Sequence, residues 1–311
     1  MRLALPAAFV ALLAATPALA DTPKVVASIK PVHALVAAVM QGVGEPALIV
    51  RGAASPHTYA LRPSDAHALA DADLVFWIGP ELEGFLAKPL EATATKATAV
   101  ELMEAPGVML LDAREGGAWD PHDHGHDHGA HEHGHDKGHE EVNTHVWLDP
   151  DNARAMVAAI ADALEAKDAA HADAYRANAE RTARGLAALD AELKATLAPV
   201  QGKPFVVFHD AYQYFEAHYG LNGVGAITVN PERRPSAKRL SDIRAKITSL
   251  GAVCVFAEPQ FEPALVDTIV QGTKARKGVL DPEGAGLADG PDLYPTLLRN
   301  IAASLKGCLA S

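Results

Sequence analysis

Cysteine, aromatic residues, basic charge and long apolar runs are all scarce in this 311-residue sequence. Its two cysteines, Cys254 and Cys308, cannot form a Cys-x-x-Cys metal motif or a dense disulfide framework. Acidic side chains outnumber basic ones by 39 to 27, which argues against a nucleic-acid partner. The acidity fits either a metal cation as partner or a role in solubility alone. Beyond the first twenty residues, no apolar run approaches the roughly 18 residues that a membrane-spanning helix needs.

The first twenty residues have the pattern of a secretory signal peptide. Arg2 provides the positive start, a stretch rich in alanine and leucine provides the apolar middle, and Ala18 and Ala20 form a small-residue cleavage site before Asp21. No cysteine follows this site to receive a lipid. We therefore expect cleavage after Ala20 and a soluble protein in the periplasm.

In that oxidising compartment, an even pair of cysteines predicts a disulfide between Cys254 and Cys308. A bridge that closes so long a loop stabilises a fold by roughly 4 kcal/mol in the chain-entropy model, mainly through the unfolded state. Metal ligation by the thiols is the less favoured alternative, because Cys254 lies in an apolar run that predicts a buried strand.

Apolar strands alternate with helices in the first and last parts of the chain, which is the pattern of parallel sheets covered by helices. In the first part the predicted strands span 24–29, 46–50 and 73–79, with helices at 30–43 and 65–72. In the last part the strands span 204–210, 223–229, 252–259 and 277–282, with helices at 236–251 and 263–275. The sequence therefore predicts an α/β protein with two lobes, in keeping with a chain too long for one ordinary core.

A helix-forming run between these parts, residues 151–197, is rich in alanine and charge and contains no proline. Leu186, Leu189, Leu193 and Leu197 recur there at helical spacing, and we expect this stripe to pack on the lobes. A stiff helix that joins two lobes would limit hinge motion between them. The predicted division is a signal peptide at 1–20, an N-terminal lobe at 21–150, a helical region at 151–199 and a C-terminal lobe at 200–311.

A stretch dominated by histidine, glycine and acidic residues, at 119–141, interrupts the first lobe. It cannot bury a core, so we expect a mobile loop when no metal is bound. Its imidazoles offer overlapping sets of metal ligands, each of which must order the chain to form, and this predicts several weak sites. They belong to His122, His124, His126, His128, His131, His133, His135 and His139.

Four other residues lie at turns beside predicted strands, and open α/β sheets bind ligands at the carboxyl ends of their strands. His57 and His145 come from the first lobe, and His209 and Asp281 from the second. Three imidazoles and one carboxylate would satisfy tetrahedral zinc in the cleft between the lobes. For each residue taken alone, the alternative is structural: a hydrogen-bonded histidine or an Asp-Pro turn.

The segments around these residues resemble one family. Over nearly the whole mature chain the sequence carries, in this order, SPHTYALRPSD, NTHVWLDP, VVFHDAYQYF, CVFAEPQF and VLDPEG. Together they resemble the periplasmic zinc-binding proteins of ABC importers, the ZnuA type of the cluster A-I solute-binding proteins. The acidic, histidine-rich insert just before the second ligand segment belongs to the same resemblance.

The resemblance implies two (β/α) lobes joined by a long rigid backbone helix, with the metal between the lobes and no enzymatic activity. The family's ligands map onto His57, His145 and His209, with Asp281 as a fourth ligand or its near neighbour. The other matches are paired cysteines at Cys254 and Cys308, and residues expected to surround or pack against the site: Arg62, Ser64, Asp65, Trp147, Asp149 and Glu258.

The third ligand position helps to choose the metal. Manganese-binding relatives typically carry a glutamate there, whereas the nitrogen donor of His209 favours zinc. Thr58 departs from those members that place an acid beside the first histidine. We therefore expect a monomer that captures zinc and delivers it to an inner-membrane ABC permease driven by a cytoplasmic ATPase. The alternatives are manganese or another divalent ion on the same architecture, a zinc hydrolase or lyase that uses an open metal position, and a metal-storage protein.

Overall fold

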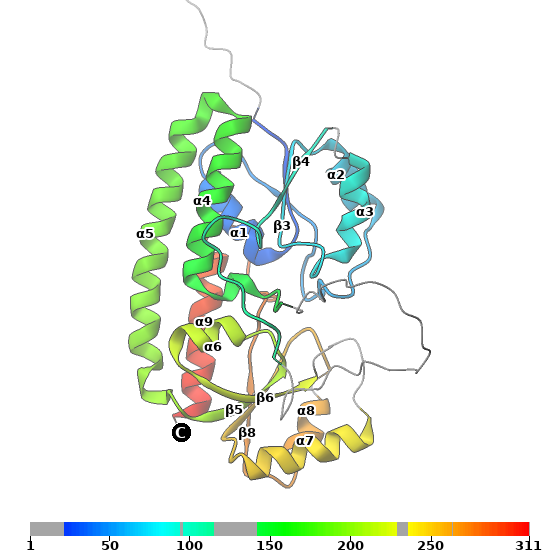
Figure 1. Ribbon diagram of the computed structural model, residues 1–311, viewed down its shortest axis with the longest axis vertical. Coiled ribbons are helices and arrows are strands. Elements are labelled where there is room, and N and C mark those ends of the chain that lie inside the picture. The colour runs from blue at the N-terminus through cyan, green and yellow to red at the C-terminus, as the bar shows by residue number, and fades with distance from the viewer. Residues whose placement is uncertain (1–21, 94–95, 115–141, 229–235, 263, 311) are drawn as a thin grey trace, which may run out of the picture.

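The computed structural model describes residues 22–93, 96–114, 142–228, 236–262 and 264–310 (Figure 1). Two predictions fall outside these residues: the signal peptide at 1–20 and the histidine-rich stretch at 119–141. The described chain forms two parallel sheets, one above the other in Figure 1, with long helices along one side of both. No helix in this described part is long and apolar enough to span a bilayer.

The N-terminal sheet has the strand order β2-β1-β3-β4, and all its strand pairs are parallel. Its strands are β1 (Val25–Ala27), β2 (Ala47–Leu48), β3 (Leu74–Trp77) and β4 (Thr98–Glu101). They are connected by α1 (Lys30–Val39), α2 (Pro63–Asp71) and α3 (Gly84–Thr93). The sequence pattern did not reveal α3 or β4, because α3 contains Pro89 and β4 is a partly exposed edge strand without an apolar run.

The C-terminal sheet repeats this arrangement, with the order β6-β5-β7-β8 and parallel pairing throughout. Its strands are β5 (Pro204–His209), β6 (Asn222–Thr228), β7 (Cys254–Ala257) and β8 (Arg276–Val279). They are connected by α6 (Gln213–Tyr219), α7 (Ala237–Ser249) and α8 (Ala264–Val270), and α9 (Leu293–Leu309) follows. Each sheet therefore has a switch point between its first and third strands, where crevices form at the carboxyl ends.

The predicted disulfide between Cys254 and Cys308 is confirmed, and it ties β7 to α9. Helices α6 and α9 were absent from the sequence prediction. Helix α9 buries residues at helical spacing, including Leu297, Leu298 and Ile301, so its signal was present in the sequence.

The predicted helix-forming run at 151–197 consists of two antiparallel helices, the second of which is the long helix expected between the lobes. Helices α4 (Pro150–Lys167) and α5 (Ala172–Leu197) are separated by the short 3-10 turn Ala169–His171. Asp168 makes the break, because its φ of −134° and ψ of 76° leave the helical region. Its carboxylate accepts hydrogen bonds from His171 and from the hydroxyl of Tyr175, which stabilises the turn.

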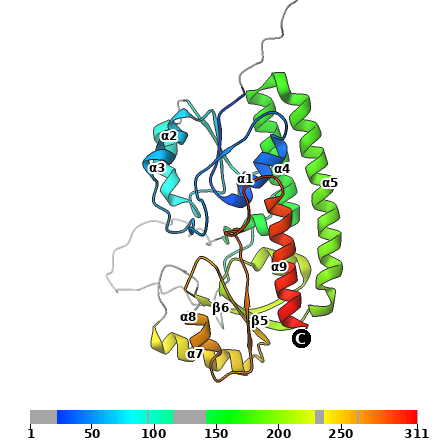
Figure 2. The same ribbon diagram turned by 180° about the vertical axis from the view of Figure 1, so that it is seen from behind.

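Helix α5 is the stiff connector between the sheets. It has 26 residues and so extends about 39 Å at 1.5 Å per residue. It packs against α1 on the N-terminal side and α9 on the C-terminal side (Figure 2). The predicted leucine stripe of α5 is buried, and one continuous hydrophobic cluster joins it to residues of both sheets, such as Phe76 and Phe205. The two lobes therefore share a core.

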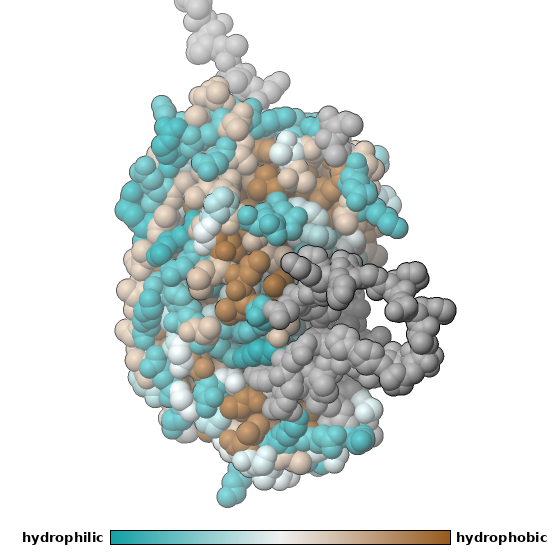
Figure 3. All heavy atoms as spheres, viewed as in Figure 1, coloured by the Kyte–Doolittle hydropathy of each residue, from teal (hydrophilic) through white to brown (hydrophobic). Residues whose placement is uncertain are grey.

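The surface is mixed in polarity. Figure 3 shows hydrophilic residues spread over the face seen in Figure 1, with hydrophobic patches between them. Among the described residues, the large hydrophobic side chains that stay exposed are Met109, Leu110, Leu250 and Val279.

Candidate metal centre

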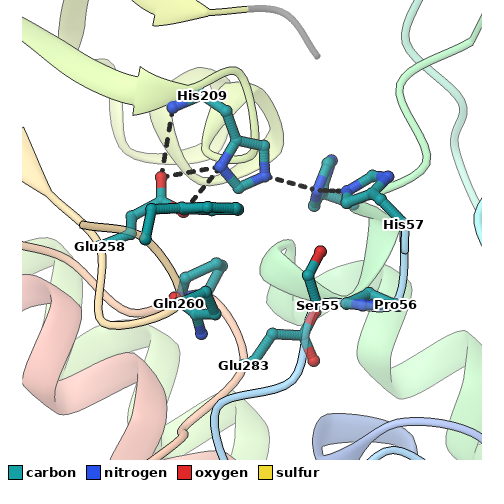
Figure 4. A pocket seen from close by; sticks show the side chains of 10 residues that line it. Ser55, Pro56, His57, His209, Glu258, Gln260 and Glu283 are labelled. Atoms are coloured by element: carbon teal, nitrogen blue, oxygen red, sulfur yellow. Dashed lines mark hydrogen bonds and ion pairs between the residues drawn. The ribbon is translucent and has the colours of Figure 1, made fainter. Parts of the chain in front are cut away.

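Three histidines from distant parts of the chain converge between the two sheets (Figure 4). His57 lies in the loop between β2 and α2, His145 directly precedes the 3-10 turn Val146–Leu148, and His209 is the last residue of β5. The Nε2 atom of His145 is 3.4 Å from Nε2 of His57 and 3.1 Å from Nε2 of His209. Within the described ranges, this is one of two groups whose ligand atoms lie close enough to hold a metal ion.

These separations fit one ion bound by all three rings. Two nitrogens at 2.0 to 2.1 Å from a tetrahedral zinc ion are about 3.3 Å apart. His145 and His209 are 6% and 4% exposed, whereas His57 is only partly buried. The ring of His57 therefore lies on the more accessible side of the group.

Asn143 determines which nitrogen of His145 is free to bind a metal. Its side-chain oxygen lies 3.1 Å from the backbone amide of His145 and 2.8 Å from Nδ1 of the ring. Its amide nitrogen donates to the carbonyl of Asp210 and to the side chain of Gln213, which defines the orientation of the amide group. Nδ1 of His145 therefore carries the proton, and Nε2 presents its lone pair to the other two rings.

Glu258 performs the same task for His209. Its carboxylate lies 2.8 Å from Nδ1 of the His209 ring and 3.3 Å from the His209 backbone amide. Glu258 directly follows β7, which pairs with β5, so the two residues meet at the switch point of the C-terminal sheet. A carboxylate behind a metal-binding imidazole fixes the ring and increases its basicity.

Burial keeps two of the three rings neutral. Removal from water, reinforced by the neighbouring His209, lowers the pKa of His57 to about 3. The same two effects, together with His57 itself, hold the pKa of His145 well below its usual value. Metals bind neutral imidazole, so neither ring has to release a proton first at neutral pH. The site thus offers nitrogen donors of the kind that suit a borderline divalent cation.

The structure does not bring Asp281 into the histidine group. Its Oδ1 accepts hydrogen bonds from the backbone amides of Glu283 and Gly284. Gln260 donates a further bond to Oδ1, and the backbone amide of Ala285 donates to Oδ2. Asp281 therefore closes the turn after β8, which is the structural alternative for an Asp-Pro sequence.

Glu283 lines the histidine pocket. It is 5% exposed, and Figure 4 shows its side chain reaching toward Ser55 and Pro56 on the opposite wall. Burial, followed by the repulsion of Asp281 and other carboxylates, raises the pKa of Glu283 well above its usual value. The pocket thus contains a buried acid beside its three imidazoles.

The loop that carries His57 is held by residues that the resemblance pointed to. Asp65 accepts hydrogen bonds from the backbone amide of Arg62 and the hydroxyl of Tyr59, which anchors the end of this loop to the start of α2. The hydroxyl of the neighbouring Ser64 also contacts the Asp65 carboxylate at 3.4 Å. These residues support the loop and do not line the pocket.

Trp147 holds the segment that carries His145. Its ring packs against the imidazole of His145 with a centroid distance of 5.1 Å. Its indole nitrogen donates to the carbonyl of Pro282, and its own carbonyl accepts from the hydroxyl of Tyr294. Trp147 therefore joins the His145 segment to the turn beside Glu283.

Asp149 belongs to the second group of possible metal ligands, with Asp151 and His218. Asp149 caps α4 by accepting from the amide of Asp151, and it lies 3.1 Å from Nδ1 of His218. Nε2 of His218 lies 2.8 Å from Asp190 on α5. The bond to Asp149, then that to Asp190, raises the pKa of His218 against the effect of burial. When protonated, His218 thus serves as the cation between these carboxylates.

Arg114 steadies the residue next to His209. Its guanidinium pairs with Asp210 at 2.9 Å and with Glu216 on α6 at 2.6 Å. Asp210 in turn provides the carbonyl that orients Asn143. Arg114 therefore belongs to the same network as two of the three histidines.

Sequence reasoning missed three residues of this region. Asn143 could have been predicted, because the side-chain oxygen of an asparagine commonly accepts a hydrogen bond from the backbone amide two residues later, here that of His145. Glu283 and Arg114 carried no such signal, since their positions depend on how distant turns fold.

Two facing α/β lobes with parallel sheets, and a long helix packed on both, define the architecture of this chain. The fold is similar to that of the protein described as "Crystal structure of ZnuA", with a TM-score of 0.77 over 93% of this chain and 100% of that one at 24% identity. It is also similar to FpvC from Pseudomonas aeruginosa in complex with Mn²⁺, with a TM-score of 0.78 over 93% and 99% of the two chains at 20% identity. At these identities the likeness establishes the fold.

The chain belongs to the ZnuA family, "Zinc-uptake complex component A periplasmic", whose model matches residues 25–308. It is 52% identical over 305 residues to the high-affinity zinc uptake system protein ZnuA of Brucella suis biovar 1 (strain 1330), covering 92% of this chain and 91% of that protein. It is 41% identical over 307 residues to the protein of the same name from Yersinia pestis, covering 96% and 95%. The family resemblance drawn from the sequence motifs is thus confirmed.

Proposed function

We propose that this chain is the periplasmic zinc-binding component of an ABC importer. It captures zinc between its lobes and delivers the ion to an inner-membrane permease with a cytoplasmic ATPase. The observation that carries the proposal is the convergence of three Nε2 atoms, with separations of 3.4 and 3.1 Å, in a buried position. Relatives named as high-affinity zinc uptake proteins, at up to 52% identity over most of the chain, support it.

His57, His145 and His209 are the zinc ligands in this proposal. Their origin in three separate segments means that one ion ties loops from both lobes together. Asn143 and Glu258 lie against Nδ1 of His145 and His209, which supports binding of the ion through the opposite nitrogen, Nε2, of each ring. A nitrogen donor at the third position favours zinc over manganese, which prefers oxygen.

The eight histidines of residues 119–141 act as accessory sites that collect or sense zinc. This part of the proposal rests on composition: many imidazoles on an acidic, apolar-poor segment give several weak ligand sets, each with an ordering cost. The lobes at 21–150 and 200–311, the helical region at 151–199 and the cleaved segment at 1–20 complete the proposed organisation. N-terminal sequencing of the exported protein tests cleavage after Ala20, and light scattering tests the expected monomer.

The protein has no enzymatic activity in this proposal. Three histidines with an open position could also activate water, as in a zinc hydrolase or lyase. Zinc-loaded protein is therefore expected to hydrolyse an activated ester no faster than its His209→Ala variant. A zinc-dependent turnover lost in that variant would favour the hydrolase.

A calorimetric zinc titration of the metal-free mature protein tests the function. Wild type is compared with His209→Ala, with a deletion of residues 119–141, and with His67→Ala, a control at an exposed histidine of α2. We expect one tight site in wild type, its loss in His209→Ala, and its retention in the deletion and the control. If the tight site disappears with the deletion instead, the chain buffers metal through its histidine run. Competition with manganese separates the two metals.

A further inference from the structure

We propose that Arg114 is a positioning residue for the three histidines, which raises their affinity for zinc by holding Asp210 in place. This inference rests on the proposed function and concerns the same site. A guanidinium group is always charged and has no lone pair to offer, so Arg114 cannot itself bind a cation. Any effect of Arg114 on zinc must therefore pass through the residues that it bonds.

Arg114 holds the side chain of Asp210 through several hydrogen bonds. Its Nε atom lies 2.9 Å from Oδ2 and 3.1 Å from Oδ1 of the carboxylate, and Nη2 also donates to Oδ1. The two side chains are 20% and 11% exposed, so water and salt screen this pair less than they screen an ion pair on the surface. Because Asp210 directly follows His209 in the chain, the pair also restrains the backbone next to that ring.

A second link leads from Asp210 to His145. The backbone carbonyl of Asp210 accepts a hydrogen bond from the amide nitrogen of Asn143 at 2.8 Å. This bond is one of two that keep the Asn143 oxygen turned toward Nδ1 of His145, 2.8 Å away. If Asp210 shifted, Asn143 would lose that restraint, and so would the ring of His145. One ion pair thus acts on two of the three imidazoles.

Glu216 on α6 fixes the guanidinium from another side. Its Oε2 atom lies 2.6 Å from Nη1 of Arg114, and its side chain is 5% exposed. Gly223 on β6 leaves room for this carboxylate, because a Cβ atom at that position would collide with the Glu216 oxygens. Arg114 is therefore held by two largely buried carboxylates, which leaves its side chain little freedom to release Asp210.

The test compares the variants Arg114→Met, Arg114→Lys and Asp210→Ala with wild type. The matched control is Arg176→Met on α5, because Arg176 also pairs with two carboxylates, those of Glu165 and Asp173. Zinc affinity is measured by competition with a chelator, and urea unfolding of the metal-free proteins shows which variants are folded.

We expect Arg114→Met and Asp210→Ala to weaken zinc binding by about 10-fold, the lower end of the range typical for residues that support metal ligands. Arg114→Lys keeps the charge but not the planar fork, so its affinity should fall between those of Arg114→Met and wild type. Arg176→Met should keep the wild-type affinity. Since Arg114→Met leaves two buried carboxylates without their cation, Asp210→Ala replaces it throughout if it does not fold.

A double-mutant cycle with Asn143→Ala gives a readout that a purely structural role would not change. Because Arg114 acts on His145 through Asn143, Arg114→Met should reduce zinc affinity by a smaller factor in the Asn143→Ala background than in wild type. A residue that only stabilises the fold would reduce affinity by the same factor in both backgrounds.

Three results would overturn the inference: wild-type affinity in the folded variant, equal losses in the two backgrounds, or a loss in Arg176→Met as large as that in Arg114→Met. Failure of the proposed function gives a different result. In that case wild type itself would show no tight site that depends on His209.

Discussion

The carboxylate of Glu258 lies 2.8 Å from Nδ1 of His209, while Nε2 of the same ring lies 3.1 Å from Nε2 of His145. The two nitrogens of the His209 imidazole thus have separate partners: one is held by a carboxylate, and the other faces the Nε2 atom of His145. Two residues at the ends of neighbouring strands, β5 and β7, produce this arrangement.

Glu258→Gln should weaken zinc binding by about tenfold, because the amide can still accept a bond from Nδ1 but no longer raises the basicity of the ring. Glu258→Ala removes the acceptor altogether and should cost about 100-fold. Chelator competition measures both, with the exposed Glu262→Gln as a control for charge. Equal affinities in all these proteins would show that Glu258 has no part in orienting the ligand.

Asn143→Ala should weaken zinc binding by about 10- to 100-fold, because the ring of His145 loses the acceptor that holds its proton on Nδ1. The matched control is Asn222→Ala on β6, whose side chain bonds the carbonyl of Gly202 on the protein surface. Chelator competition again provides the measurement. A loss of affinity of the same size in the control would contradict a specific role for Asn143.

The pairing of His218 with Asp149 and Asp190 should make stability depend on pH. Since folding raises the pKa of His218, its contribution is fully present below the unfolded value of about 6.5 and is lost as the pH rises through the folded value. His218→Gln should therefore lower the free energy of unfolding by about 1 to 2 kcal/mol at pH 6, and by less at pH 9. Urea unfolding at both pH values measures this.

The control for this experiment is His67→Gln, at an exposed position of α2, which should change stability little at either pH. A difference between His218→Gln and wild type that stays constant with pH, or grows at high pH, would contradict a protonated bridge. Such a result would assign His218 a packing role only.

Loss of the disulfide should destabilise the protein without removing the metal site. The bridge joins residues 54 positions apart. The chain-entropy model assigns about 4 kcal/mol to a loop of that size. The double variant Cys254→Ala/Cys308→Ala should therefore unfold at lower urea than wild type, while it still binds one zinc ion tightly at saturation. Unchanged unfolding would mean that the bridge contributes little beyond the packing of β7 on α9.

The sequence predicted well those features of the fold and of the site that depend on a single segment of the chain. The apolar runs of β1, β3, β5 and β7 are buried on both faces, so they stand out as strands even without a partner. The histidines were marked by their place beside such strands. The disulfide was marked by the lack of any other cysteine. Each of these features depends on one short segment or on the count of one residue type, so the sequence alone is enough to predict it.

The sequence was less informative where several groups compete for the hydrogen bonds of one side chain. An Asp after a strand suits a metal ligand and a turn equally, and only the folded turn shows that four donors take up Asp281. Asp168 likewise lies in a run that favours helix, and its bonds to the nearby His171 and Tyr175 outweigh that preference. Helix propensity is a weak term, and local side-chain hydrogen bonds compete with it.

The core that α5 shares with both sheets has a consequence for how cargo leaves. Two lobes that share one close-packed interior cannot separate widely without losing that packing. Release of a bound ion therefore has to proceed by breaking the individual bonds between the ion and its ligands. If the three histidines hold zinc as proposed, the ion would leave by stepwise exchange of its ligands, and His57, the most accessible of the three imidazoles, would be the first to be exchanged. The residence time of zinc would then depend on how quickly a ligand atom of the receiving protein can replace the ring of His57.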